Sequence, residues 1–240
     1  MKILSRRPTA TLVLLLGLLW VPLLASAEWN VDLYGGGAFT QNSEVTQTST
    51  LGVTLSTDLK VDSSFTVGGR AGYWFESLPY LGMGLDVFYF QPDIPTQTAT
   101  FTASGLGSAV GQWRKTSVDV IGVGFDVLRL RLPLLKSDQF RHGRLQPYVT
   151  AGPALFFTKI KDTDSFAPSN QSRNDTSVGV KVGAGFAFHL TKAIALFAEY
   201  RFTHFKADAT FTDTTPPPSQ ETVKATFDTH HAIGGISFRF

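Results

Sequence analysis

The chain has no cysteine, no marked excess of charge of either sign and, beyond its first residues, no long hydrophobic run. Without cysteine it has no disulfide framework, no thiolate metal site and no cysteine nucleophile. Its 21 basic residues nearly balance its 19 acidic ones, so it lacks the basic excess typical of a nucleic-acid-binding protein. After residue 28, no segment is apolar over the length that predicts a membrane-spanning helix.

The first residues predict a secretory signal peptide. Basic residues within the first seven positions precede an apolar stretch at 10–24, and Ala25-Ser26-Ala27 gives the small-x-small pattern of a cleavage site. We predict cleavage after Ala27, so that 1–27 is removed and 28–240 forms one exported domain. The alternative is an uncleaved membrane anchor, but the apolar stretch is shorter than the roughly 20 residues that span a bilayer.

The rest of the chain alternates between apolar and small or polar side chains. In segment 178–190 the even positions from Val178 to Leu190 are apolar and the odd positions are small or polar. A strand places two such sets on opposite faces, whereas a helix would spread both around its circumference. Seven further segments alternate similarly: 29–39, 65–75, 81–91, 117–128, 146–157, 194–206 and 223–240. Pro153 predicts a distorted position within its strand.

The links between these segments alternate in length. Short links fall at 76–80, 129–145 and 191–193, and long polar links fall at 40–64, 92–114, 158–176 and 207–222. Short periplasmic turns and long outer loops are typical of transmembrane barrels. A soluble barrel would show a polar exterior, whereas here the charges share one face and the large apolar groups the other. The sequence therefore predicts an all-β fold, an eight-stranded antiparallel transmembrane β-barrel.

Aromatic residues near the strand ends predict two interfacial girdles. The inner girdle would contain Trp29, Trp74, Phe75, Tyr80, Phe238 and Phe240, and the outer one Tyr89, Phe90, Phe157 and Phe205.

Three stretches resemble the outer-membrane β-barrel-domain family, which includes OmpA/OmpX-like eight-stranded barrels and small porin-family surface antigens. They are Val182-Gly183-Ala184-Gly185-Phe186, the strand at 196–202 and the ending Phe238-Arg239-Phe240. The resemblance implies the bacterial outer membrane, with contacts to its lipid and lipopolysaccharide. It also implies recognition by the barrel-assembly machinery through Ile236, Phe238 and Phe240. It leaves function open, because the family includes adhesins, anchors, small pores and lipid-modifying enzymes.

The alternation places four acidic and four basic side chains inside the barrel: Asp32, Arg70, Asp86, Asp126, Lys181, Glu199, Arg201 and Arg239. The interior of an eight-stranded barrel is just wide enough for side chains, and buried charges need partners. Equal numbers of both signs therefore predict a paired network that plugs the lumen. A narrow pore or an acid/base pair are the alternatives for the same residues.

No catalytic, cofactor or metal site is predicted. His204 and His230 would face outward near the outer rim, with Asp228 nearby, and such groups can bind metal or haem. No tight spacing motif supports a site, so interfacial polar residues are the preferred interpretation. His231 and Ser237 share a face but stand six residues apart on one strand, about 20 Å, too far for a Ser–His pair.

We therefore predict a non-enzymatic, monomeric protein without a cofactor. Its role would be structural or adhesin-like, through outer loops that bind an extracellular ligand. A narrow pore or a conduit for small solutes or apolar compounds is the second hypothesis. A lipid-modifying enzyme is the third.

Overall fold

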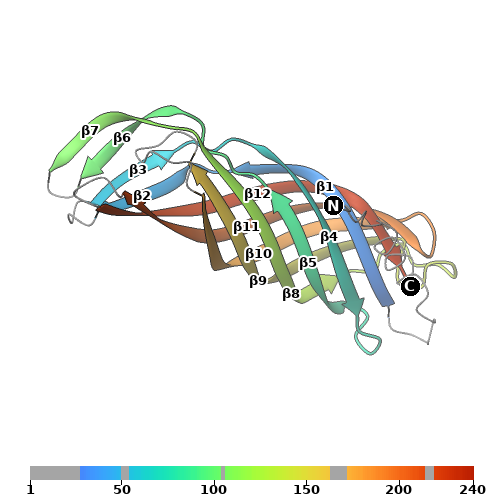
Figure 1. The fold of residues 1–240 in the computed structure, drawn as a ribbon. Coiled ribbons are helices and arrows are strands. Elements are labelled where there is room, and N and C mark those ends of the chain that lie inside the picture. Colours follow the sequence, from blue (N-terminus) through green and yellow to red (C-terminus); the bar gives the residue numbers. More distant parts are fainter. Residues whose placement is uncertain (1–27, 50–53, 104–105, 163–171, 214–218) are drawn as a thin grey trace, which may run out of the picture.

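The computed structural model describes residues 28–49, 54–103, 106–162, 172–213 and 219–240, so the predicted signal peptide lies outside the described residues. These residues form twelve strands (Figure 1). Their bounds are β1 (Glu28–Thr40), β2 (Ser43–Ser49), β3 (Thr54–Leu59), β4 (Ser64–Trp74), β5 (Leu81–Phe90), β6 (Gln97–Ala103), β7 (Gly107–Trp113), β8 (Thr116–Arg131), β9 (Leu145–Asp162), β10 (Ser172–His189), β11 (Ile194–Asp213) and β12 (Ser219–Arg239). Within the described ranges, no helix is long and apolar enough to cross a membrane.

Eight strands close into an antiparallel barrel, as predicted. The order is β1-β4-β5-β8-β9-β10-β11-β12, and β12 also pairs with β1. Leu33 of β1 shows the closure, because it pairs with Gly69 of β4 on one side and with Ile236 of β12 on the other. The first and last described residues lie together, since the Trp29 amide donates to the Phe240 carbonyl. We call this end of the barrel the terminal end and the opposite end the extended end.

Four strands extend the sheet beyond the barrel at the extended end. β12 pairs with β2, and the sheet continues through β3 and β6 to β7 (Figure 1). The prediction of polar loops at 40–64 and 92–114 was therefore wrong for these strands, and parts of 158–176 and 207–222 also belong to β9–β12. The sequence predicts loops for these segments because most of their residues are polar. They nevertheless bury a few apolar side chains, such as Val45 and Leu59.

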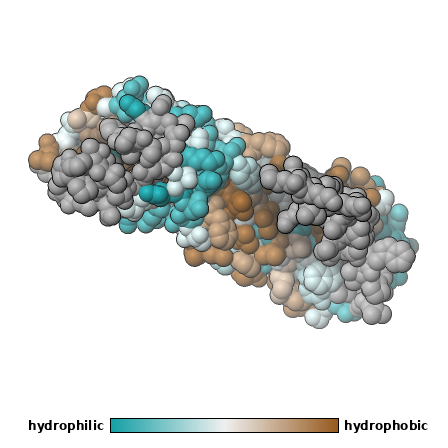
Figure 2. All heavy atoms as spheres, viewed as in Figure 1, coloured by the Kyte–Doolittle hydropathy of each residue, from teal (hydrophilic) through white to brown (hydrophobic). Residues whose placement is uncertain are grey.

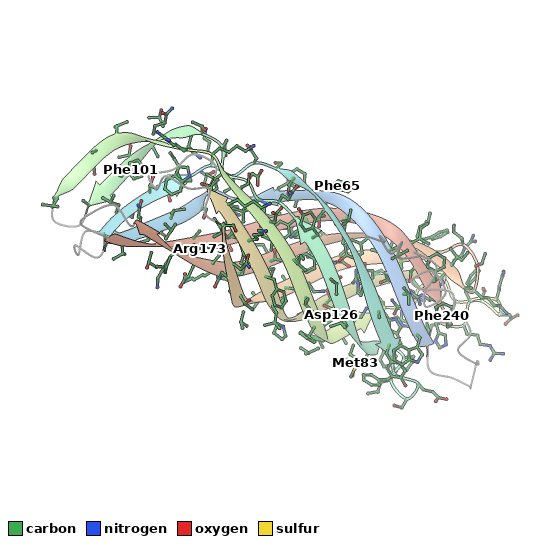
Figure 3. All side chains as sticks on the ribbon, viewed as in Figure 1. Phe65, Met83, Phe101, Asp126, Arg173 and Phe240 are labelled. Atoms are coloured by element: carbon green, nitrogen blue, oxygen red, sulfur yellow. The ribbon has the colours of Figure 1, made fainter. Side chains whose placement is uncertain are left out.

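The outside of the barrel is apolar. Leu33, Phe65 and Val178 are 58%, 67% and 72% exposed, and Figure 3 shows Phe65 and Met83 on the outer side of the wall. Figure 2 shows hydrophobic residues gathered over the middle of the molecule, next to a hydrophilic zone toward the extended end. Such a continuous apolar surface is stable in lipid and not in water. The outward face therefore spans a membrane.

The predicted aromatic girdles are only partly correct. Trp29, Tyr80 and Phe240 are exposed at the terminal end, and Phe157 is exposed nearer the extended end.

Trp74, Phe90 and Phe205 are buried in the lumen instead. Each shares the inward phase of a charged residue on its own strand. Trp74 follows Arg70 by four residues, and Phe90 follows Asp86 by four. Since a strand has a period of two, an even offset returns a side chain to the same face.

A β-bulge interrupts β8. Its pairing with β9 shifts register between Gly124 and Leu128, so β8 carries an extra residue there. The bulged backbone approaches β9 closely, because a Cβ on Gly152 would lie 1.8 Å from the Phe125 carbonyl oxygen. The neighbouring Pro153 has no N–H for the ladder and therefore suits a distorted position.

Candidate functional site

The eight charged residues predicted inside the barrel all point into the lumen. They are Asp32, Arg70, Asp86, Asp126, Lys181, Glu199, Arg201 and Arg239, and none is more than 8% exposed. Each comes from a barrel strand in which alternate residues face inward.

Asp86 is one centre of this cluster. Its Oδ2 atom lies 2.6 Å from Lys181 Nζ and 2.9 Å from Arg201 Nη2. The Tyr34 hydroxyl donates a hydrogen bond to Asp86 Oδ1 at 2.5 Å. Asp86 therefore ties together β5, β10, β11 and β1.

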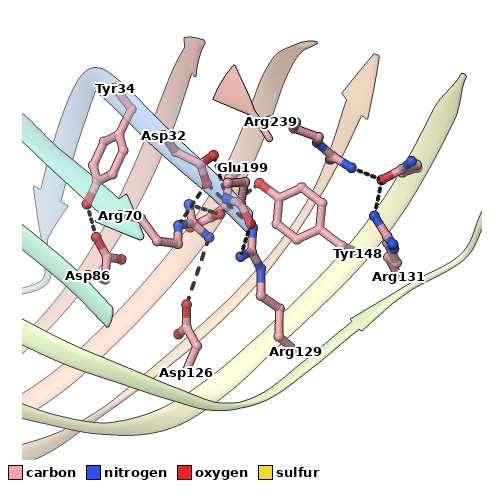
Figure 4. Close-up of polar contacts among 12 residues, drawn as sticks. Asp32, Tyr34, Arg70, Asp86, Asp126, Arg129, Arg131, Tyr148, Glu199 and Arg239 are labelled. Atoms are coloured by element: carbon pink, nitrogen blue, oxygen red, sulfur yellow. Dashed lines mark hydrogen bonds and ion pairs between the residues drawn. The ribbon is translucent and has the colours of Figure 1, made fainter. Parts of the chain in front are cut away.

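Glu199 is a second centre (Figure 4). Its Oε2 atom accepts hydrogen bonds from Arg70 Nη2 at 2.7 Å and from the Tyr148 hydroxyl at 2.8 Å. Its Oε1 atom accepts one from Arg201 Nε at 3.0 Å. Both oxygens are thus satisfied by partners on β4, β9 and β11.

Asp126 and Asp32 complete the charged layer. Asp126 lies 2.7 Å from Lys181 Nζ and 4.0 Å from Arg70 Nη1. Asp32 Oδ2 lies 3.4 Å from Arg70 Nε and 3.5 Å from Arg129 Nη2. Arg70 therefore contacts carboxylates from β1, β8 and β11.

A smaller cluster lies toward the terminal end. Arg131 Nη2 donates to Glu28 Oε2 at 2.5 Å, and Arg239 Nη1 donates to Glu28 Oε1 and, at 2.9 Å, to Gln146 Oε1. The guanidinium of Arg131 lies 4.3 Å from the centre of the Trp74 ring, where a cation–π contact stabilises it.

The sequence prediction missed Arg129 and Arg131 because it ended the strand at 128 and placed both in the link at 129–145, whereas β8 continues to Arg131. The bulge would also have defeated an extension of the pattern. Strict alternation from the inward Asp126 would place Leu128 inward and both arginines outward. The extra residue reverses this phase, so both arginines are buried and Leu128 is exposed. The lumen also contains Glu28, so the described residues place five acidic and six basic side chains there instead of four of each.

Every one of these acids has at least two bases within 4.0 Å. Pairing offsets the cost of removing the charges from water, and loss of one partner is destabilising. A cavity of about 10 Å³ lies between these side chains, beside Asp32 and Arg129. Such a volume holds about one water molecule.

An aromatic layer fills the lumen on the extended side of the charges. Its buried rings are Phe88, Phe90, Phe156, Phe205 and Phe227, with His231 among them. The rings of Phe156 and Phe205 stack with centroids 4.1 Å apart, and His231 Nε2 lies 3.1 Å from Thr203 Oγ1. The prediction that the inward face is charged therefore holds only for the terminal half of the lumen.

Two other histidines, His204 and His230, lie on the outer face of the wall. His204 Nδ1 lies 2.6 Å from Asp228 Oδ1, and His230 Nδ1 lies 2.5 Å from the Tyr200 hydroxyl. Both histidines face outward near the extended end of the wall. The described part of the chain contains no group of three or more His, Cys, Asp or Glu residues placed to hold a metal ion.

The residues predicted to signal assembly lie where the barrel closes. Ile236 and Phe240 are exposed on its outer surface, and Phe238 pairs with Val31 of β1. The Phe240 amide donates to the Trp29 carbonyl at 3.0 Å. The recognition of these residues by the barrel-assembly machinery stays a prediction.

Comparisons with known proteins agree with this architecture. A family model described as outer membrane protein beta-barrel domain matches residues 11–240. Among curated proteins, none matches the chain. OprG from Pseudomonas aeruginosa, a solved outer membrane protein, is similar with a TM-score of 0.50 and 11% identity, over 90% of this chain and 96% of that one. Neisserial surface protein A is similar with a TM-score of 0.44 and 14% identity, over 90% and 100%. The outer membrane protease OmpT from Escherichia coli is similar with a TM-score of 0.46 and 7% identity, over 91% and 99%.

Proposed function

The chain belongs to the outer membrane protein β-barrel domain family, and from this premise we propose that it is a non-enzymatic surface protein with a closed lumen and an adhesin-like extension. The terminal end is the periplasmic end, and the extended end faces outward. The barrel anchors the extension, and the extension binds an extracellular protein.

Closure of the lumen is supported by two layers of different chemistry. On the periplasmic side, the paired charges around Arg70 and Asp86 occupy the barrel axis. On the outer side, buried rings such as Phe156 and Phe205 stack against one another. An ion crossing the barrel would have to break ion pairs and then pass an apolar layer, and both steps are costly.

The observation that carries the adhesin-like role is the edge of the extension. Among the described strands, β7 pairs with β6 alone. An unpaired edge offers backbone N–H and C=O groups to another strand, and natural proteins usually protect such edges. Here Leu106 and Val110 are instead 78% and 73% exposed beside it. These features suit a partner that adds an extended segment to the sheet.

The histidine contacts support the absence of catalysis. Inside the barrel, the ring of one described histidine, His231, contacts a hydroxyl, that of Thr203. Both residues are fully buried, so a substrate cannot reach them. No hydroxyl among the described residues hydrogen-bonds to the His204–Asp228 pair. We expect lipid A extracted from expressing cells to keep an unchanged mass spectrum. A new lipid A species that depends on His204 would contradict the proposal.

Attachment of expressing cells to surfaces coated with serum or extracellular-matrix proteins tests the adhesin-like role. The Leu106→Lys/Val110→Lys double variant places charges beside the free edge, which opposes strand addition. We expect attachment to fall to the level of cells without the protein. Thr48→Lys is the matched control, because Thr48 is also exposed on the extension but on an inner strand, β2.

Surface display of every variant is measured with an antibody to the folded protein. Equal attachment of the double variant and the wild type, at equal display, would contradict a role for the β7 edge. No attachment by the wild type to any coated surface would contradict the adhesin-like role itself.

A further inference from the structure

A cavity of about 410 Å³ opens at the periplasmic end of the barrel, at the mouth of the lumen. It is lined by the link between β8 and β9, by the turn between β10 and β11, and by the last residues of the chain. Its volume lies within the range of sites for small molecules, about 300–1,000 Å³.

The link between β8 and β9, at 132–144, forms one wall of this cavity, and its conformation is held by hydrogen bonds. Gln146 Nε2 donates hydrogen bonds to the carbonyls of His142 at 2.7 Å and Gly143 at 3.0 Å. Gly143 has a φ of 84°, and a Cβ there would lie 2.5 Å from the Leu134 carbonyl oxygen. The His189 amide donates to the Arg144 carbonyl at 2.8 Å, which ties the link to β10.

The charges around the cavity favour an anion. Arg141 and Lys192 line its exposed part, and Arg239 lines its base. Of the two acids in its lining, Glu28 is already paired with Arg239 and with Arg131, which lies deeper in the lumen. Asp138 is then the acid that remains to offset the two exposed cations, Arg141 and Lys192, so the exposed part of the cavity carries an excess of positive charge.

We propose that this cavity binds a small carboxylate-bearing molecule of amino-acid or dipeptide size. Arginine and lysine nitrogens are suitable donors to a carboxylate, and an arginine can engage both of its oxygens. The rings of Phe140 and Phe240 also line the cavity and offer apolar surface to the short body of such a ligand. The site faces the periplasm and does not depend on the binding activity of the extension.

The test uses the mature protein in detergent micelles, with imidazole NMR signals as the readout. The probes are N-acetyl-alanyl-alanine, the same dipeptide with a C-terminal amide, and inorganic phosphate. We expect the free acid to shift the His189 signals in a saturable way, with a Kd at least tenfold below that of the amide. Arg141→Gln and Lys192→Gln each remove one cation from the lining, and we expect each to weaken binding about tenfold, which is about 1.4 kcal/mol.

Lys136→Gln is the matched control, because it removes one exposed cation from the same link outside the cavity lining. We expect it to leave the Kd unchanged. Equal binding of acid and amide, or equal weakening by Lys136→Gln and Arg141→Gln, would overturn the proposal. Saturable binding of phosphate without binding of the dipeptide acid would overturn the carboxylate assignment.

Discussion

Substitution of Glu199 by alanine tests the buried charge network most sharply. Glu199 is 4% exposed, and its carboxylate accepts hydrogen bonds from Arg70, Arg201 and Tyr148. In the Glu199→Ala variant, two buried guanidinium groups and a buried hydroxyl lose an acceptor together.

The expected loss of stability follows from what each partner retains. Breaking a buried ion pair by removing one member costs about 3–5 kcal/mol. Arg70 keeps Asp32 at 3.4 Å, and Arg201 keeps Asp86 at 2.9 Å. Because neither arginine becomes wholly unpaired, we expect the free energy of unfolding to fall by about 3 kcal/mol, the lower end of that range.

Urea unfolding in detergent micelles, followed by tryptophan fluorescence and by heat-modifiable gel mobility, measures this loss. Glu44→Ala is the matched control, since Glu44 is exposed on β2; we expect it to change the free energy of unfolding by less than about 0.5 kcal/mol. A Glu199→Ala variant as stable as Glu44→Ala would refute the reasoning and show that Glu199 is solvated in a wet lumen.

Three further results are expected. Leu85→Arg should impair barrel assembly in the heat-modifiability assay, because an arginine facing lipid near mid-depth costs about 2–4 kcal/mol. Thr48→Arg on the extension should be tolerated. Equal tolerance of both substitutions would mean that the lipid-facing side is misassigned. Gly152→Ala should reduce the yield of folded barrel, because its Cβ would lie 1.8 Å from a carbonyl oxygen of the bulge. Gly69→Ala is the control, because its Cβ would meet nothing closer than 3.5 Å. Similar yields of the two variants would show that the bulge can relax. N-terminal sequencing of protein from the outer membrane should begin at Glu28, and recovery of the uncleaved chain in the inner membrane would contradict cleavage.

The sequence predicts the barrel and its charged lining well because both depend on the period of two along a strand. Glu199 and Arg201 alternate with the exposed Tyr200 and the outward Phe202, and the structure places both charges inside. Which acid contacts which base was not predictable. These contacts cross the barrel, and they depend on the stagger of strands that are distant in sequence.

Two features escaped prediction for local physical reasons. Arg129 and Arg131 fell in the predicted link at 129–145, but β8 continues through them. A bulge turns both inward, and nothing in a strictly alternating pattern marks one extra residue. The extension strands are rich in threonine and serine, a composition that favours loops, whereas the β-branched threonine side chain also suits a strand. Pro153, beside the bulge, was the one local signal of distortion.

Single-channel recording of the purified wild-type protein in planar bilayers tests the closed lumen most directly. The paired charges and the aromatic layer predict no steady conductance under an applied voltage, at neutral pH and moderate salt. The Glu199→Ala variant, if it assembles, would serve as a comparison in the same bilayers. A wild-type barrel that conducts steadily would contradict closure and make the protein a narrow pore.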